Sequence, residues 1–363
     1  MRQSIKAVVA SFTVIATLGV FFLLSDMAEP VRLKYGPSHS AISLGNKPQG
    51  GHPSPPPPPP PASHDSSAAV GSSEYTVDAY VKCFTEVTGH NVMYDVERCI
   101  SDIRHQNQLR VMDKILELPT HKLSRYEGWG PDLAVPDWII FDLFKPTYEC
   151  NAMDLLRIGG ASKVTDTGKW LCSDKINFGS GPDKKCVIYS LGSNNQFDFE
   201  QEMHRLFPSC AIHTFDCTGD WSDPSTTYHK WCIGGKDEID SQGRQYKRVS
   251  TISKELGVET VSLLKMDIEN FEWAFFLDLL NEPVENRPMQ ILVEFHGGMP
   301  DNKVPKPWLL APSIFEGWKR NWAIPIARMV KLFDKLGYRI AFQERNRHGQ
   351  FATEIILIHE RAL

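Results

Sequence analysis

The sequence predicts an α/β fold with an open, mainly parallel sheet, helices on both faces and a C-terminal antiparallel hairpin. From about residue 137 onward, near-continuous apolar runs alternate with stretches of helical periodicity, which is typical of strands covered on both faces. The last two apolar runs are separated only by Gln343–Thr353. This connection is too short for a crossover helix, so we expect the two strands to pair as a hairpin.

Residues 1–29 predict membrane attachment. Ala7–Leu24 is an apolar run of eighteen residues without a charge, long enough to cross a bilayer as a helix. Asp26 lies where a signal peptidase site would need a small neutral residue, which favours an uncleaved signal anchor over a signal peptide. With Arg2 and Lys6 on the cytosolic side, we expect a single-pass type II membrane protein. Its body would lie in the lumen of the endoplasmic reticulum or Golgi; secretion after signal cleavage is the alternative.

Two further segments precede the sheet. Residues 30–73 carry eleven of the 25 prolines, including the run Pro55–Pro61, and have too few apolar residues to form a core. We expect a disordered linker in extended polyproline II conformation. In residues 74–136 apolar side chains recur at helical spacing, which predicts a small helical module that packs on the rest of the chain. The sheet-bearing domain then occupies residues 137–363.

The strands and helices of this domain follow from its apolar pattern. Apolar runs predict strands at residues 186–191, 211–216, 261–267, 290–295, 338–342 and 354–359. Between the first two strands, Phe199 and Met203 lie on one face of a predicted helix, and Phe271 and Phe275 do the same after the third. A helix between successive strands is the connection that parallel pairing requires.

Charge and cysteine content narrow the classes of partner. The net charge is −5 and no long run of Lys or Arg occurs. A nucleic-acid partner is therefore not expected, because most affinity for nucleic acid comes from neutralising phosphates. The eight cysteines fit an oxidising compartment, and the sequence leaves their pairing open. Some, such as Cys186, are alternatively small buried apolar residues.

The ends of the first two predicted strands indicate an adenosine site. Gly192, Ser193 and Asn194 follow the first strand, and Asp216 ends the second, twenty-four residues after the glycine. A glycine turn lets the backbone approach a ligand, and an acid at about this spacing accepts hydrogen bonds from both ribose hydroxyls. The turn has one glycine rather than the three of a dinucleotide-binding motif, which favours a nucleoside ligand without phosphates over NAD.

The ends of the next two predicted strands carry acids and a histidine. Asp267, Glu269 and Glu272 lie within six residues where the third strand passes into a helix, and helix capping explains at least one of them. Lys265 shares the strand face of Asp267, so the two could form an ion pair. His296 follows the fourth strand, and we expect it near Asp267 if the two strands are neighbours.

These residues resemble a known family. The resemblance rests on Ser190–Ser193 (SLGS), Phe199–Glu200, Leu264–Glu272 (LKMDIENFE) and Ile291–His296 (ILVEFH). They are similar to the methyltransferase-like proteins, and more narrowly to the secreted or membrane-anchored methyltransferase-like protein 24 type, which is related to FkbM-type O-methyltransferases. The resemblance covers roughly residues 145–360.

The resemblance implies a class I, Rossmann-like methyltransferase fold with S-adenosylmethionine as cofactor. By that resemblance, Gly192 and Ser193 (with Asn194 beside them) approach the methionine moiety, Asp216 binds the ribose and Asp267 lies beside the methyl sulfonium. Two departures from the family pattern are the single-glycine turn and an asparagine, at position 270, where the family often has glycine.

The sequence thus predicts a secretory-pathway methyltransferase that acts on a hydroxyl or carboxyl oxygen of an unidentified acceptor. The predicted catalytic residues are Asp267, Glu269 and His296, with His296 or Glu294 as the base that removes a proton from the acceptor. The sequence supports no metal site, although a divalent ion on Asp267 and Glu269 is an alternative way to orient the acceptor. The second hypothesis is a catalytically degenerate, membrane-anchored binding or scaffold protein with the same fold.

Overall fold

The computed structural model describes the chain from the predicted helical module to the C-terminus, with gaps. It covers residues 77–85, 92–118, 141, 143–160, 168–176, 186–297, 306–318, 322–345 and 352–363. The predicted signal anchor (residues 1–29) and proline-rich linker (residues 30–73) lie outside these ranges. Among the described helices, none is both long and apolar enough to cross a membrane.

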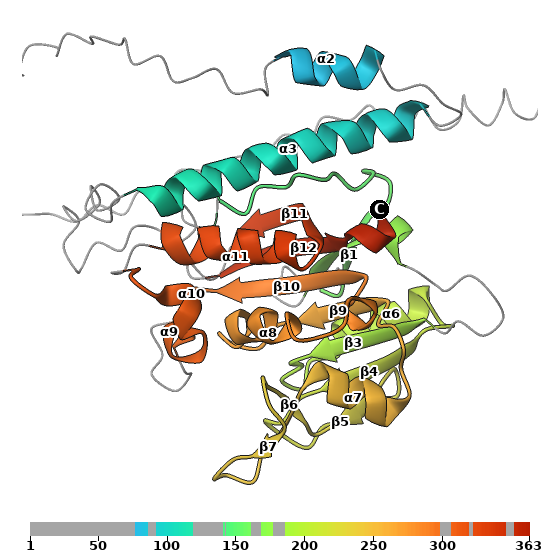
Figure 1. The fold of residues 1–363 in the computed structure, drawn as a ribbon. Helices are drawn as coiled ribbons and strands as arrows, with labels where there is room; N and C mark the ends of the chain where they lie inside the picture. The colour runs from blue at the N-terminus through green and yellow to red at the C-terminus, as the bar shows by residue number, and fades with distance from the viewer. Residues whose placement is uncertain are drawn as a thin grey trace, which may run out of the picture. The chain divides into compact units, whose positions relative to one another are not determined.

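A seven-stranded sheet forms the centre of the fold (Figure 1). In sheet order its strands are β11 (Tyr338–Arg345), β12 (Ala352–His359), β10 (Gln290–His296), β9 (Leu263–Met266), β3 (Val187–Leu191), β4 (Ala211–Phe215) and β5 (Thr227–His229). β12 runs antiparallel to both neighbours, whereas the pairings from β10 through β9, β3 and β4 to β5 are parallel. The predicted mainly parallel sheet with a C-terminal antiparallel hairpin is confirmed.

The edge strand β5 is absent from the predicted strands. It has three residues and reads Thr-Tyr-His, so no apolar run marks it. It is defined only by its pairing with β4, in which Phe215 lies opposite His229. A strand this short is detected from its neighbour rather than from its own composition.

Alternate residues of the central strands pack into two separate cores, one on each face of the sheet. Tyr189 and Leu191 of β3 belong to the core on one face, whereas Ile188 belongs to the other. Leu292 and Val293 of β10 divide in the same way. This period of two explains why the strands read as continuous apolar runs in the sequence.

Helices cover both faces, as predicted. The described helices are α2 (Val77–Thr85), α3 (Val92–Glu117), α6 (Asp198–Leu206), α7 (Val249–Leu256), α8 (Glu272–Leu279), α9 (Pro307–Leu310), α10 (Pro312–Phe315) and α11 (Ala323–Lys335). The face packed by Tyr189 is covered by α7, α8 and α11, which contribute Ile252, Phe276 and Phe333 to its core. The other face is covered by α6, which contributes Phe199 and Met203.

The long helix α3 packs on α11 and belongs to the same unit as the sheet (Figure 1). His105 of α3 lies 2.7 Å from the carboxylate of Asp334 on α11, and the side chain of Met112 is part of the core. Within the predicted helical module (residues 74–136), the described helices therefore lie in one unit with the predicted sheet domain (residues 137–363).

Two small sheets flank the main one, and one of them matters for the site. β1 (Leu155–Ile158) and β2 (Lys169–Cys172) form an antiparallel pair, while β6 (Cys232–Ile233), β8 (Gln245–Lys247) and β7 (Glu238–Ile239) form a three-stranded sheet. The side-chain amide of Gln290 on β10 exchanges two hydrogen bonds with the backbone of Cys172, at 2.9 and 3.0 Å. This buried contact holds β2 against the central sheet.

All eight cysteines lie in disulfide bonds. The pairs are Cys83–Cys99, Cys150–Cys172, Cys186–Cys210 and Cys217–Cys232. The alternative that Cys186 is only a small buried apolar residue is wrong, because it pairs with Cys210 where β3 and β4 begin. Four disulfides are consistent with a secreted or lumenal protein.

Two histidines at the β4–β5 edge make stability depend on pH. The rings of His213 and His229 are joined by a hydrogen bond of 3.1 Å, and burial, with a smaller effect of His229, lowers the pKa of His213 to about 4. The unfolded chain takes up this proton near pH 6.5, whereas the native state resists it, so stability should fall as the pH drops from about 6.5 to about 4.

The measurement is the unfolding temperature as a function of pH for the wild type and for His213→Gln. We expect the wild type to lose stability more steeply between these pH values, because its native state keeps both histidines neutral, whereas the variant has only His229, whose pKa burial also lowers. Equal slopes in the two proteins would contradict a neutral, buried His213.

Candidate functional site

The four predicted strand ends meet at one edge of the sheet. Met266 of β9 pairs with Leu191 of β3 and with Val293 of β10, all in parallel register. The amide of Asp267 donates to the carbonyl of Leu191 at 3.0 Å, and the amide of Gly192 donates to Phe215 at the end of β4 at 2.9 Å. The residues that follow these strands are therefore brought to one edge, where open α/β sheets bind ligands.

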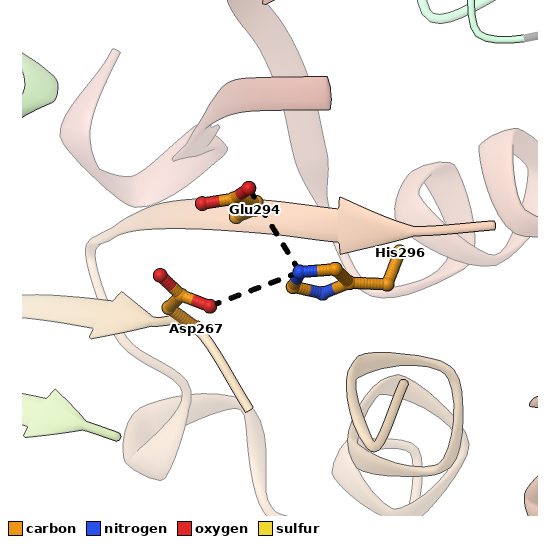
Figure 2. Close-up of side chains that lie close together, drawn as sticks. All are labelled: Asp267, Glu294 and His296. Carbon is orange, nitrogen blue, oxygen red and sulfur yellow. Dashed lines mark ion pairs between the residues drawn. The ribbon is translucent and has the colours of Figure 1, made fainter. Parts of the chain in front are cut away.

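His296 and three carboxylates converge at this edge, and Figure 2 shows two of them, Asp267 and Glu294, facing the imidazole. Nε2 of His296 lies 3.9 Å from Oδ1 of Asp267, 3.8 Å from Oε1 of Glu294 and 3.8 Å from Oε2 of Glu269. The other ring nitrogen, Nδ1, lies 3.0 Å from Oε1 of the fully buried Glu272. His296 and Asp267 thus lie close together, as expected. The contact between Nδ1 and Glu272 orients the imidazole ring.

A lysine from β2 enters the same cluster. The ammonium of Lys169 lies 2.6 Å from Oε2 of Glu294, 3.3 Å from Oδ2 of Asp267 and 2.5 Å from Oε1 of Glu354. Its side chain is 1% exposed, so it is an ion-paired charge in the protein interior. Sequence reasoning missed Lys169 because it lies about a hundred residues before its partners, with no motif around it.

Glu354 was also absent from the predicted site, although its position in a buried apolar strand could have indicated it. It opens a buried apolar strand, and the antiparallel register of β10 and β12 places it directly opposite Glu294. Two acids facing each other on interior strands need a cation between them. Lys169 supplies that cation.

The charges of the cluster shift one another's pKa values. Burial disfavours the imidazolium, but the carboxylates of Glu272, Asp267 and Glu294 outweigh it and raise the pKa of His296 to about 10. Burial would raise the pKa of Asp267, yet Lys169, followed by smaller effects of other cations, holds it below its usual range. Burial also opposes the charge on Lys169, and its three carboxylate partners raise its pKa well above the ordinary lysine value. The arrangement is a mutually dependent set of buried charges.

Lys265 does not form the possible pair with Asp267. Its ammonium donates instead to the carbonyl of Gly192, with a longer contact of 3.5 Å to the carbonyl of Leu191. The flexible lysine side chain reaches these backbone acceptors at the end of β3, although it shares a strand face with Asp267.

Gly192 has a structural role in addition to the predicted one. Its φ is 79°, and a Cβ atom there would lie 2.0 Å from the carbonyl oxygen of Asp267. Glycine is therefore required so that the β3 and β9 loops can pack together, and not only for approach to a ligand. Glu269 and Asn270 in the second loop also have positive φ, 55° and 78°. Asparagine tolerates this conformation better than most residues, which accounts for its place in the turn.

Asp216 is bound to the glycine loop. Its Oδ2 accepts hydrogen bonds from the amides of Ser193 and Asn194 at 2.9 and 2.7 Å, and its Oδ1 accepts from the amide and hydroxyl of Thr218 at 2.8 and 2.6 Å. Burial opposes the charge, but these hydrogen bonds keep the pKa of Asp216 below its usual value. Since a carboxylate has about four acceptor positions, a ribose that donates from both hydroxyls would have to replace two of these donors. The hydroxyl of Thr218 is the one that rotates freely.

The loop that follows Asp216 is held at both ends. The Cys217–Cys232 disulfide closes it, and the hydroxyl of Tyr228 donates to the carbonyls of Asp216 and Gly219. The indole nitrogen of Trp221 in this loop is buried and has no hydrogen-bond partner in the described part of the chain. It is an unsatisfied donor close in sequence to the predicted ribose-binding acid.

A family model described as a methyltransferase domain matches residues 126–343, more than half of the chain. No curated protein matches the sequence. Three solved structures show the level of structural similarity. TnmH is 12% identical, with 51% of this chain and 53% of that chain covered and a TM-score of 0.25. Human N-acetylserotonin methyltransferase in complex with SAM is 12% identical, with coverages of 48% and 47% and a TM-score of 0.24.

The third structure is a variant of the 16S rRNA (adenine(1408)-N(1))-methyltransferase from Catenulisporales acidiphilia. It is 9% identical, with 48% of this chain and 84% of that chain covered and a TM-score of 0.27. The chain spans about half of the length of the first two proteins. Similarities this distant carry no argument about substrates, and the family assignment rests on the matched domain and the strand order.

Proposed function

The chain belongs to the methyltransferase-domain family that it matches, and on this basis we propose that it is an S-adenosylmethionine-dependent O-methyltransferase of the secretory pathway. The observation that carries the proposal is the convergence of Asp267, Glu269 and His296 at the edge of the sheet where the β3 turn and Asp216 also lie. The narrower relationship, to the methyltransferase-like protein 24 type, belongs to the same proposal.

The residues at this edge fit the cofactor in charge and in donor chemistry. Four carboxylates lie within 4 Å of His296, so negative charge is in excess where a cationic sulfonium would lie. We assign ribose binding to Asp216, and the hydroxyl of Thr218 is a hydrogen-bond donor that the ribose would displace. Trp221 supplies an unsatisfied buried donor in the adjoining loop.

When bound, S-adenosylmethionine supplies an electrophilic methyl group, and the chain's own residues position the acceptor and accept its proton. Among the carboxylates around His296, Glu269 has the most exposed side chain, 52%, against 30% for Asp267 and 5% for Glu294. An incoming acceptor hydroxyl would therefore meet Glu269 first. We assign the proton-accepting role to Glu269 and an orienting role to the buried His296–Glu272 pair.

Two observations support the location and the chemistry of the acceptor. Four disulfides suit an oxidising lumen, and the apolar segment Ala7–Leu24 offers a route into it, by a retained anchor or a cleaved signal. A carboxylate beside the site can accept the proton that an acceptor hydroxyl loses when it is methylated. This chemistry favours an oxygen nucleophile.

The direct test is calorimetric titration of S-adenosylhomocysteine into the purified full-length chain in detergent. We expect saturable binding with one site, and a rise in the unfolding temperature, because a ligand that binds only the native state stabilises it. If neither a binding heat nor a thermal shift is observed, the methyltransferase proposal fails and the catalytically degenerate scaffold is the better account.

A further inference from the structure

The cluster at the end of β9 and β10 has the geometry of a metal site. One atom each from Asp267, Glu294 and His296 lies within 4.8 Å of the others, and the three side chains point toward a common position in Figure 2. Two donors that each lie about 2.1 Å from one ion are separated by roughly 3 to 4.2 Å, depending on the angle between them. The measured distances from Nε2 of His296 to the two carboxylates, 3.8 and 3.9 Å, lie in this range.

Each carboxylate divides its two oxygens between different cations. Oδ2 of Asp267 and Oε2 of Glu294 face the ammonium of Lys169, at 3.3 and 2.6 Å. Oδ1 of Asp267 and Oε1 of Glu294 face the imidazole of His296. Lys169 thus contacts one oxygen of each carboxylate, and the other oxygen of each faces the imidazole.

His296 is prepared as a ligand by its other nitrogen. Nδ1 lies at hydrogen-bond distance from Glu272, which directs Nε2 into the cluster, and carboxylate–histidine pairs of this kind orient metal-bound imidazoles. The side chain is 6% exposed, yet Nε2 has only contacts of 3.8 to 3.9 Å among the described residues and no hydrogen bond there. Nε2 thus faces three carboxylates at distances that leave room for an ion between them.

A second atom beside the imidazole lacks a partner. Oε1 of Glu272 lies 3.0 Å from Nδ1 of His296, and the second oxygen of Glu272 is buried and has no hydrogen-bond partner in the described ranges. It belongs to the residue that orients the ring.

We propose that Asp267, Glu294 and His296 bind a divalent transition-metal ion such as Mn²⁺, with Glu269 at the exposed side as the proton acceptor. Mixed carboxylate and imidazole ligands favour such an ion over Mg²⁺ or Ca²⁺, which take oxygen ligands. Three protein ligands leave positions open for water or substrate. The site rests on geometry alone; its use, to hold and acidify an acceptor oxygen, rests on the proposed methyltransferase function.

The test uses Mn²⁺ alone and the chelator-treated full-length chain, without cofactor or acceptor. Electron paramagnetic resonance of free Mn²⁺ gives the affinity, and pulsed measurements detect nitrogen coupling from a bound imidazole. We expect one ion per chain with nitrogen coupling. His296→Ala should remove the coupling and weaken binding at least about tenfold, the loss typical when even an outer partner of a metal ligand is removed. Asp267→Asn and Glu294→Gln should weaken binding and retain the coupling.

His204→Ala is the matched control, since His204 is an exposed histidine near the end of α6 and outside the cluster. It should bind Mn²⁺ as the wild type does. The proposal is overturned if the wild type retains no Mn²⁺, in which case a protonated imidazole is the occupant, or if nitrogen coupling persists in His296→Ala. If that variant does not fold, the wild-type coupling and the two carboxylate variants decide. Separate titration with S-adenosylhomocysteine distinguishes failure of this site from failure of the proposed function.

Discussion

Replacing Lys169 with methionine should destabilise the native state by about 3 to 5 kcal/mol, the range for removing one partner of a buried ion pair. The ammonium is 1% exposed and contacts Asp267, Glu294 and Glu354. Methionine fills a similar volume, so little of the loss would come from packing. The effect should arise because three carboxylates are left without the cation that lies between them.

Chemical denaturation of Lys169→Met and of a matched control measures this loss. Lys230→Met removes an exposed pair with Asp220, in which both side chains are more than half exposed, and should change stability by less than about 1 kcal/mol. Adding Glu354→Gln to Lys169→Met should change stability little further, because burial and the neighbouring Glu294 raise the pKa of Glu354 well above its ordinary value, so that little charge is removed. A loss in Lys169→Met no larger than in the control would mean that the carboxylates do not depend on this ammonium.

Asp216→Ala should weaken the binding of S-adenosylhomocysteine about a hundredfold or more. Two hydrogen bonds from ribose hydroxyls to a carboxylate contribute on the order of 1.5 to 3 kcal/mol each, and each 1.4 kcal/mol is about tenfold in affinity. The substitution also releases the amides of Ser193 and Asn194, which hold the β3 turn in place. Both consequences act in the same direction on affinity.

The variant Thr218→Val tests the ribose hydrogen bonds separately from the bonds between Asp216 and the β3 turn. It removes one hydroxyl bond to Oδ1 of Asp216 and leaves the carboxylate and its bonds to the turn intact. Affinity should stay within a few-fold of the wild type, since the freed acceptor position is the one assigned to the ribose. Calorimetric titration of both variants gives the comparison. Wild-type affinity in Asp216→Ala would exclude Asp216 from the adenosine site.

Much of the sheet could be predicted because its strands have a local signature. The runs that became β3, β4, β9, β10, β11 and β12 are buried on both faces, so apolar residues fill consecutive positions and mark each strand without reference to its neighbours. The short connection before β12 then determined the antiparallel hairpin. β5 has no such run, and only pairing with β4 defines it.

The candidate site also contains contacts that could be predicted from the sequence and contacts that could not. Asp267 and His296 could be brought together from the sequence, because residues that follow adjacent parallel strands emerge at one edge of a sheet. The cation that pairs with Asp267 could not be predicted from the sequence. Lys265 is adjacent in sequence but donates to the Gly192 carbonyl, whereas Lys169 comes from a separate hairpin that is held against β10 by Gln290.

The amino-acid sequence alone therefore established an open, mainly parallel sheet and the edge at which its polar strand ends meet. Both follow from local periodicity and from the short range of strand connections. Only the tertiary structure decided which charges neutralise one another. A buried ammonium pairs with whichever carboxylates the packing brings within about 4 Å, and Lys169 meets Glu294 and Glu354 across 125 and 185 residues of chain. No local pattern encodes that distance.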